Sequence, residues 1–199
     1  MKRRDVLKGL GLSLGYAVAT PTVFSMLQSC KTEAEVWAPQ FLTLDEGIVL
    51  KNLVNLILPK TKKLPGALEV NVPEFIDLYV YKTYDDEAKT EFKTGFNAIM
   101  NALNIPEKGP SELKDENYDA LLAKYLKVDK EEQERIKLNE EDENAITLMA
   151  LENIRGMSIW AYKTSETVGE NILAYDPIPG VQIGCMPLEE ATGGKEWSL

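Results

Sequence analysis

The chain has 199 residues, of which 22 are Lys or Arg, 32 are Asp or Glu and none is His. The lack of histidine excludes an imidazole general base, a Ser-His or Cys-His pair, an imidazole metal ligand and a haem attached through C-x-x-C-H. Two cysteines, 155 positions apart, exclude a four-cysteine zinc site, and a net charge of −10 argues against nucleic-acid binding.

The N-terminal part of the chain resembles an export signal. Its first 30 residues carry a net charge of +3, whereas the remainder carries −13. Arg3 and Arg4 begin a stretch, RRDVLK, that is similar to a twin-arginine signal, and the apolar stretch after it is too rich in Gly, Ser and Thr for a membrane span. The sequence LQSC, ending at Cys30, resembles a lipobox whose cysteine becomes lipidated. The alternatives are an ordinary secretory signal and a chance cysteine.

The first half of the remaining chain predicts three helices. Thr43 and Glu46 form a capping box that starts the first helix, and Pro59 ends it. Pro73 is expected at the first position of the second helix, and Asp85 is expected to cap the third.

The second half predicts further helices. A short amphipathic helix is expected over residues 118–126, and the charge run at 127–143 indicates a solvated helical face or turn. The longest helical pattern covers residues 144–173, where Gly156 and Gly169 would permit close helix approach or a break. Apolar residues recur in it at three- and four-residue steps: Ile146, Met149, Ala150, Ile154, Met157, Trp160 and Ala161. Core packing is the first interpretation of this stripe, and a groove for a partner is the second.

The C-terminal tail is expected to be irregular, because Pro177 and Pro179 prevent a helix over residues 175–180. Burial of the Trp197 side chain would contribute about 2 kcal/mol of stabilising free energy, which is lost if the side chain stays in water. Cys185 is expected to be a buried thiol, because free cysteine behaves as a small apolar residue. The tail should therefore cover an apolar surface, either on its own domain or on a neighbour.

Five short segments occur in an order and spacing that identify a family. They are RRDVLK at 3–8, LILP at 56–59, GALEVNVPEFID at 66–77, TSE at 164–166 with Gly169, and YDPIPG at 175–180 leading to Gly184 and Cys185. With these segments the chain resembles the small third (gamma) subunit of the gluconate 2-dehydrogenase family.

The resemblance implies a division of labour among three subunits that oxidise sugars or sugar acids outside the inner membrane. A large FAD-dependent dehydrogenase of the GMC type holds the cofactor and the catalytic groups, and a cytochrome c subunit accepts electrons. The small subunit lacks catalytic, cofactor-binding and metal-binding residues, and its signal exports the folded flavoprotein. The lipobox-like end departs from this pattern, points to a lipid-anchored branch and leaves the cytochrome partner open.

The sequence thus predicts a mostly α protein with an export signal (1–30), a tether (31–42) and one compact helical domain with an irregular tail (43–199). The expected function is that of a non-catalytic small subunit of a periplasmic, membrane-associated dehydrogenase complex. The residues expected to dock the partner lie in the tail: Tyr175, Pro177, Pro179, Gly180, Cys185 and Trp197.

Two other functions remain open from the residues alone. In a lipid-anchored binding or scaffold protein, aromatic side chains would stack on sugar rings: Tyr79, Tyr81, Tyr84, Trp160 and Tyr162. In a carboxylate-based hydrolase, the acids with apolar neighbours that could raise their pKa are Glu74, Asp77 and Glu166.

Overall fold

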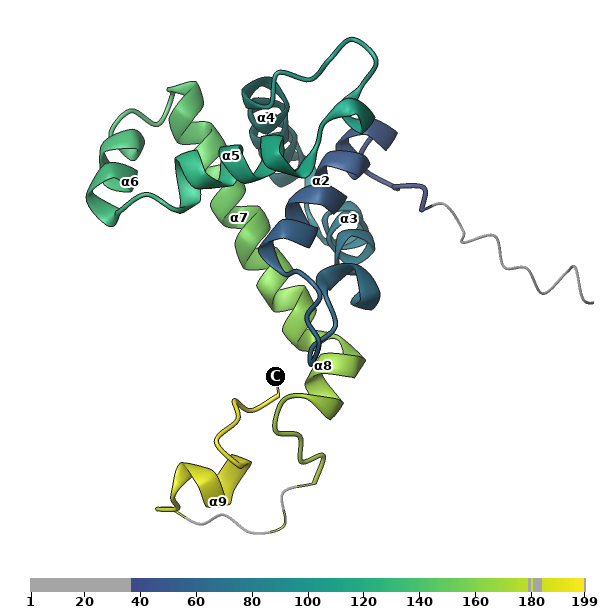
Figure 1. The fold of residues 1–199 in the computed structure, drawn as a ribbon, viewed down its shortest axis with the longest axis vertical. Coiled ribbons are helices and arrows are strands. Elements are labelled where there is room, and N and C mark those ends of the chain that lie inside the picture. The colour runs from purple at the N-terminus through teal and green to yellow at the C-terminus, as the bar shows by residue number, and fades with distance from the viewer. Residues whose placement is uncertain (1–36, 179, 181–183, 199) are drawn as a thin grey trace, which may run out of the picture. The chain divides into compact units, whose positions relative to one another are not determined.

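The structure, a computed structural model, describes residues 37–178, 180 and 184–198. Within these ranges the chain forms eight α-helices and two short 3-10 helices with no extended strand, which confirms the predicted mostly α fold (Figure 1). Arg3, Arg4, Cys30 and Pro179 lie outside the described residues. None of the helices in the described ranges combines the length and apolarity that a bilayer crossing requires.

The three helices predicted in the first half are present, and two of them, the first and the third, begin at side-chain caps. In α2 (Leu44–Ile57), Glu46 N–H donates to the Thr43 hydroxyl and the Glu46 carboxylate accepts from Thr43 N–H at 2.7 Å. The short η1 (Ala67–Val70) leads into α3 (Val72–Thr83), which begins one residue before the predicted start, so that Pro73 is its second residue. The Asp85 side chain caps α4 (Asp86–Ala102) by accepting from Ala88 N–H at 2.9 Å.

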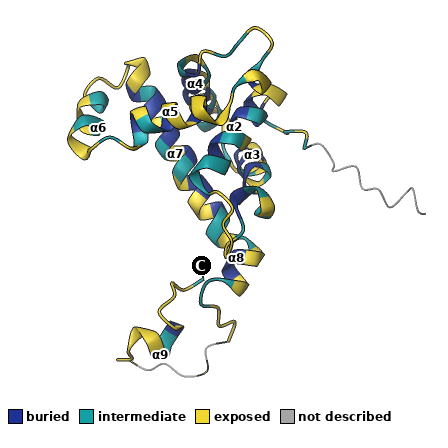
Figure 2. Cartoon of the chain, viewed as in Figure 1, coloured by how far each residue is buried: buried dark blue, intermediate teal, exposed yellow. Residues whose placement is uncertain are grey.

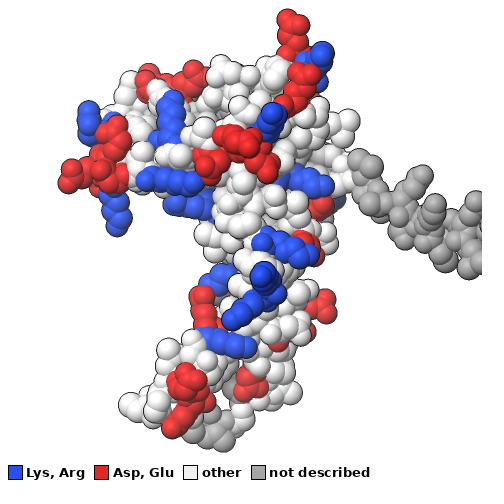
Figure 3. Space-filling model, in the orientation of Figure 1, with Lys and Arg blue, Asp and Glu red and all other residues white. Residues whose placement is uncertain are grey.

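The second half contains more helices than the sequence predicts. They are η2 (Pro110–Glu112), α5 (Asp115–Leu126), α6 (Lys130–Lys137), α7 (Glu143–Thr164), α8 (Glu166–Asn171) and α9 (Leu188–Thr192). Helix α6 has no buried residue and displays acidic and basic side chains together, as the charge run predicts (Figure 3). The tail, expected to be irregular, contains the single turn of helix α9.

One long helix was predicted over residues 144–173, but the structure divides it at Ser165. This residue is extended, with ψ at 141°, and its hydroxyl donates to the Tyr162 carbonyl at 2.7 Å. A serine hydroxyl that bonds nearby backbone competes with helical hydrogen bonding, which accounts for the break. Gly156 has no atom within 4 Å of the position a Cβ would take, so it does not serve a close approach.

Helix α7 is the centre of the compact unit Ala38–Leu199, because it contacts α2, α3, α4, α5 and α6 (Figure 1). The buried faces of α2, α3, α4 and α5 turn toward one another and toward α7 (Figure 2). The largest fully buried side chains include Tyr118, Tyr125, Phe96, Leu50, Leu53, Ile76, Leu148 and Leu151. Each such side chain stabilises the fold by roughly 1.5–3 kcal/mol through removal of apolar surface from water.

The predicted core stripe of α7 is only partly in the core. Ile154, Met157 and Ala161 are buried, but Met149 is 40% exposed and Trp160 is 39% exposed. The core interpretation was therefore wrong for Met149 and Trp160. Other residues of α7 complete the buried face: Ala145, Thr147, Leu148, Leu151 and Ser158. Because α7 is apolar on more than one side, the neighbouring helices decide which side is enclosed.

Asp77 of α3 fixes the segment that precedes α2. Its buried carboxylate accepts backbone N–H groups from Gln40 at 2.6 Å, Phe41 at 3.1 Å and Leu42 at 2.8 Å. Three donors to one carboxylate satisfy a charge that would otherwise be costly to bury. These residues, expected to belong to a tether, are held against the helical unit.

Candidate functional site

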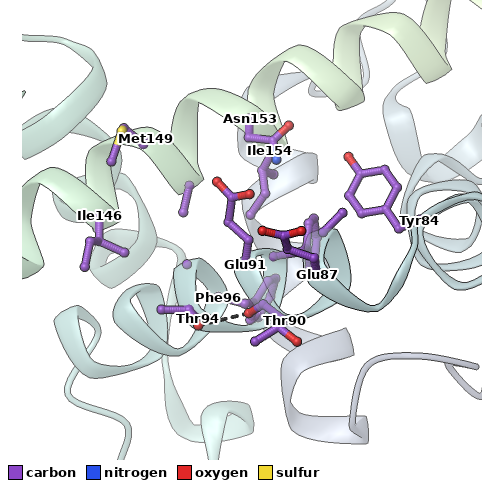
Figure 4. Close-up of a pocket in the computed structure, with 14 residues that line it drawn as sticks. Tyr84, Glu87, Thr90, Glu91, Thr94, Phe96, Ile146, Met149, Asn153 and Ile154 are labelled. Carbon is purple, nitrogen blue, oxygen red and sulfur yellow. Dashed lines mark hydrogen bonds between the residues drawn. The ribbon is translucent and has the colours of Figure 1, made fainter. Parts of the chain in front are cut away.

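A groove of about 940 Å³ lies between α4 and α7 (Figure 4). Phe92 and Phe96 of α4 and Ile146, Met149 and Ile154 of α7 supply apolar lining. Of the two exposed residues of the predicted α7 stripe, Met149 lines this groove and Trp160 does not. The second interpretation of that stripe, a groove for a partner, therefore describes Ile146 and Met149 better than the first.

The close approach of the two helices sets the floor of the groove. Gly95 of α4 is buried, and a Cβ added to it would lie 2.9 Å from the Cβ of Ala150 on α7. Real Cβ atoms essentially never come so close, so only glycine permits this contact without a shift of one helix. The small pair thereby brings two helix backbones together beneath larger apolar side chains.

The α4 edge of the groove is acidic. Glu87 and Glu91 are exposed and one helical turn apart, and their carboxylates lie on the side of α4 that faces α7 (Figure 4). Neither carboxylate forms an ion pair with any residue that the structure describes. The edge can therefore accept positively charged groups from outside.

Tyr84 closes one end of the groove. Its hydroxyl lies 3.9 Å from the Met157 sulfur. Burial, together with the nearby Tyr79 and Glu91, raises the pKa of Tyr84 above its ordinary value of 10.0, although a hydrogen bond with Asn153 opposes the shift. The phenol is protonated at neutral pH and donates its hydrogen to the Met157 sulfur.

An aromatic patch, made of Phe75, Tyr79, Tyr84 and Trp160, continues from this end of the groove. Ring centroids are 6.0 Å apart for Tyr84 and Tyr79, 5.1 Å for Tyr79 and Trp160, and 5.3 Å for Phe75 and Trp160. These contacts are edge-on, a favourable arrangement for aromatic pairs. Phe75 is 39% exposed, so the patch extends the apolar surface of the groove.

The structure brings together only some of the aromatic residues considered for sugar stacking. Tyr79, Tyr84 and Trp160 belong to the aromatic patch, whereas Tyr81 instead lies beneath the ammonium groups of Lys82 and Lys89. The Tyr162 hydroxyl donates to the Pro65 carbonyl at 2.7 Å and holds the loop before η1. The five rings do not form one platform.

The three candidate carboxylates are also divided. Glu74 and Glu166 line a second hollow of about 450 Å³, and Glu74 Oε2 is buried there without a hydrogen-bond partner among the described residues. Asp77 is occupied by the backbone of residues 40–42. In the part of the chain that the structure describes, no three potential metal ligands cluster.

The tail returns to the helical unit near its end. Ala174 N–H donates to the Glu196 carbonyl and Ser198 N–H donates to the Ala174 carbonyl, both at 2.8 Å. Lys163 of α7 forms an ion pair with Glu196. The segment between Ala174 and Trp197 is therefore a loop that is closed at its base.

Most of the residues expected to dock a partner are exposed within this loop. Tyr175 is 49% exposed and Trp197 is 51% exposed, and Pro177 and Gly180 are also exposed. The prediction that Cys185 is a buried thiol was wrong, because the structure places it at the surface. Its described neighbours from 184 to 190 are all exposed, so no apolar contact encloses the sulfur.

Among the groove residues that sequence reasoning missed, Glu87, Glu91 and Gly95 determine its charge and its depth. Two acids spaced four positions apart beside an apolar helix face, followed by a glycine inside the same helix, are a signal that could have indicated them. Their relation to α7 is a matter of tertiary structure, because Gly95 and Ala150 are far apart in the chain.

Comparison with known families gives one match. The family model described as gluconate 2-dehydrogenase subunit 3 matches residues 45–180, which is more than half of the chain. No curated protein and no solved structure matches the chain. The matched range includes α2 through α8, and with them both walls of the groove. The chain belongs to the gluconate 2-dehydrogenase subunit 3 family.

Proposed function

We propose that the chain is the non-catalytic small subunit of a membrane-associated, FAD-dependent dehydrogenase that oxidises a sugar or sugar acid. Family membership over residues 45–180 carries this proposal. The partner is a large flavoprotein of the GMC type, which holds FAD and the catalytic groups, and a cytochrome c subunit is a further partner. The chain itself supplies a folded helical surface that the flavoprotein binds.

The proposal includes export and anchoring. The twin-arginine pair Arg3-Arg4 directs the folded complex across the inner membrane, and lipid attachment at Cys30 holds it at the membrane on the periplasmic side. Both residues belong to the basic N-terminal part of the sequence, which contrasts with the acidic remainder. A flavoprotein that binds the small subunit before export would then cross the membrane as its passenger.

Apolar surface outside the core supports a role as a subunit. Large side chains at the groove, in the aromatic patch and in the tail are half exposed, among them Met149, Trp160 and Trp197. Exposed apolar groups gathered on a folded surface are typical of protein–protein contact sites. The docking tail and the groove are therefore the two surfaces that we assign to complex formation.

The test is purification of the tagged full-length chain from its native envelope under mild detergent. The expected result is a stoichiometric flavoprotein, visible by flavin absorbance, whose dye-linked oxidation of sugar acids co-elutes with the chain. A monomer without flavin that binds sugars would instead support a lipid-anchored binding or scaffold protein. Turnover of a sugar by the isolated chain would contradict the assignment of catalysis to the partner.

Export and anchoring need separate variants. Arg3→Lys with Arg4→Lys is expected to leave the chain and the flavoprotein together in the cytoplasm, because it removes the twin-arginine pair. The replacement keeps the positive charge of the segment, so a loss of export would not be a charge effect. Cys30→Ser is expected to release the exported complex into the soluble periplasmic fraction. If the flavoprotein still reaches the periplasm in the double lysine strain, the passenger role is wrong.

A further inference from the structure

We propose that the groove between α4 and α7, together with the aromatic patch, binds one amphipathic helix of the flavoprotein partner, and that basic side chains of this helix meet Glu87 and Glu91. The inference rests on the proposed function and specifies which surface of this chain the partner uses. It differs from the sequence expectation, which places docking in the tail.

The groove has the length and lining that a helix requires. On α7 the face beside the groove runs from Ile146 through Met149 and the polar Asn153 to Trp160 in the aromatic patch, which is 14 residue steps or about 21 Å along the helix axis. A partner helix of about four turns has the same length. Such helices bind grooves through apolar residues at positions i, i+3, i+4 and i+7. The flexible side chain of Met149 suits a surface that must adapt to these anchors.

The close contact of Gly95 with Ala150 explains how the surface is hollowed. Because the two backbones approach at this pair, side chains on either side of it form walls instead of filling the gap. Phe92 and Phe96 stack at 6.1 Å between ring centroids and line the α4 side of the groove. The groove is therefore present before any partner binds.

Charge identifies the occupant. The only basic side chains of α4 are otherwise engaged: Lys93 pairs with Glu46, and Lys89 lies over the Tyr81 ring at 5.8 Å. Glu87 and Glu91 thus give the α4 edge a net negative charge, and residues one turn apart on a helix lie about 5–6 Å from each other. Two Lys or Arg side chains spaced by one turn on the partner helix would face them.

A second copy of this chain is a poorer occupant. Beyond its first 30 residues the chain carries a net charge of −13, so a second copy would bring mostly like charge to an acidic edge. Oppositely charged rims favour the encounter of partners and exclude unsuitable ones. The acidic edge therefore favours a basic helix from a different polypeptide.

The first experiment uses variants of the full chain in the native complex. Met149→Glu places charge on the apolar lining, and Glu91→Lys reverses charge at the edge. The matched controls are Leu138→Glu, at a residue that is 84% exposed, and Glu134→Lys, on the exposed face of α6. We expect the amount of flavoprotein that co-purifies with each groove variant to fall by a factor of about ten or more relative to wild type. Each control variant should co-purify with the wild-type amount.

The second experiment does not depend on a loss of binding. A photo-crosslinking amino acid at position 149 is activated in the assembled complex, and the crosslinked peptide is identified by mass spectrometry. The expected peptide comes from the flavoprotein and has a helical apolar repeat with at least two Lys or Arg residues. Circular dichroism of all variants verifies that the fold is intact.

The outcomes separate this inference from the proposed function. If wild type and all four variants retain flavin equally, or if position 149 crosslinks to a second copy or to a segment without basic residues, the groove assignment is overturned while the subunit role stands. If wild-type protein carries no flavoprotein, both fail. Loss in the groove variants alone, with the expected crosslink, supports the groove assignment.

Discussion

Gly95 of α4 faces Ala150 of α7 so closely that a Cβ on the glycine would lie 2.9 Å from the alanine Cβ. The alanine Cβ is fixed to the backbone and cannot turn aside. This contact determines how near the two helices lie, and so it determines the floor of the groove.

Gly95→Ala is therefore expected to destabilise the protein, although alanine is the better helix former. Helix propensity favours the variant by up to about 1 kcal/mol, but overpacking of a close contact costs about 1–3 kcal/mol. We expect a net loss of about 1 kcal/mol in the free energy of unfolding, measured by urea denaturation. Adding Ala150→Gly should recover part of that loss, because it restores space at the contact.

The control for this prediction is Gly156→Ala on α7. No atom lies within 4 Å of the position that its Cβ would take, so only helix propensity acts there. The expected result is a gain of about 0.5–1 kcal/mol. Equal effects at Gly95 and Gly156 would show that the close approach has no influence on stability.

Asp77→Asn is expected to loosen the segment before α2. The carboxylate accepts three backbone N–H groups, whereas an amide has a single acceptor oxygen and no charge. Hydrogen bonds to charged groups contribute about 1.5–3 kcal/mol each, and we expect a loss in this range. Hydrogen exchange at Gln40, Phe41 and Leu42 should become faster. Unchanged exchange at these amides would contradict the role given to Asp77.

Helix starts could be predicted from the sequence, because the groups that fix them lie within a few residues of each other. Thr43 with Glu46 and Asp85 with Ala88 are such local pairs, and the structure confirms both. The break at Ser165 was missed, because serine is tolerated within helices and only its hydrogen bond to Tyr162 reveals the interruption. Local signals therefore predicted where helices begin better than where they end.

The side of α7 that enters the core could not be predicted, because more than one side is apolar. Leu148 and Leu151 are fully buried, yet they lie outside the stripe from which the core was predicted. Met149 and Trp160 belong to that stripe and are half exposed. The choice depends on contacts with α2 to α6, which involve residues distant in sequence. For the same reason the groove could be named only as an alternative interpretation.

The ion pair between the buried Glu46 and the partly exposed Lys93 is expected to make stability depend on acid pH. Burial alone would raise the pKa of Glu46, but hydrogen bonds from Lys93 and Thr43 hold the pKa below its usual 4.5. Since the folded pKa is the lower one, the stabilisation is complete above about pH 4.5 and is lost as pH falls through the folded pKa. Melting temperature should decrease accordingly over this range.

Glu46→Gln should remove this part of the acid dependence. An amide keeps the capping geometry but has no charge for Lys93, so we expect a loss of about 1–2 kcal/mol at neutral pH and a flatter profile below about pH 4.5. Glu140→Gln, in an exposed turn, serves as the control and should leave the profile unchanged. A profile for the Glu46 variant that matches wild type would show that another carboxyl causes the acid effect.

The exposed thiol of Cys185 provides a direct test of tail docking. In the isolated chain we expect rapid labelling by a maleimide without denaturant, because the sulfur lies at the surface. In the native complex the same thiol should react more slowly, since Tyr175 and Trp197 of the same loop are proposed to meet the partner. Mass spectrometry of the peptide that contains Cys185 separates its reaction from that of Cys30. Equal labelling rates in the free and assembled states would place this part of the loop outside the interface. Slow labelling in the free chain would contradict the exposed position of the Cys185 sulfur.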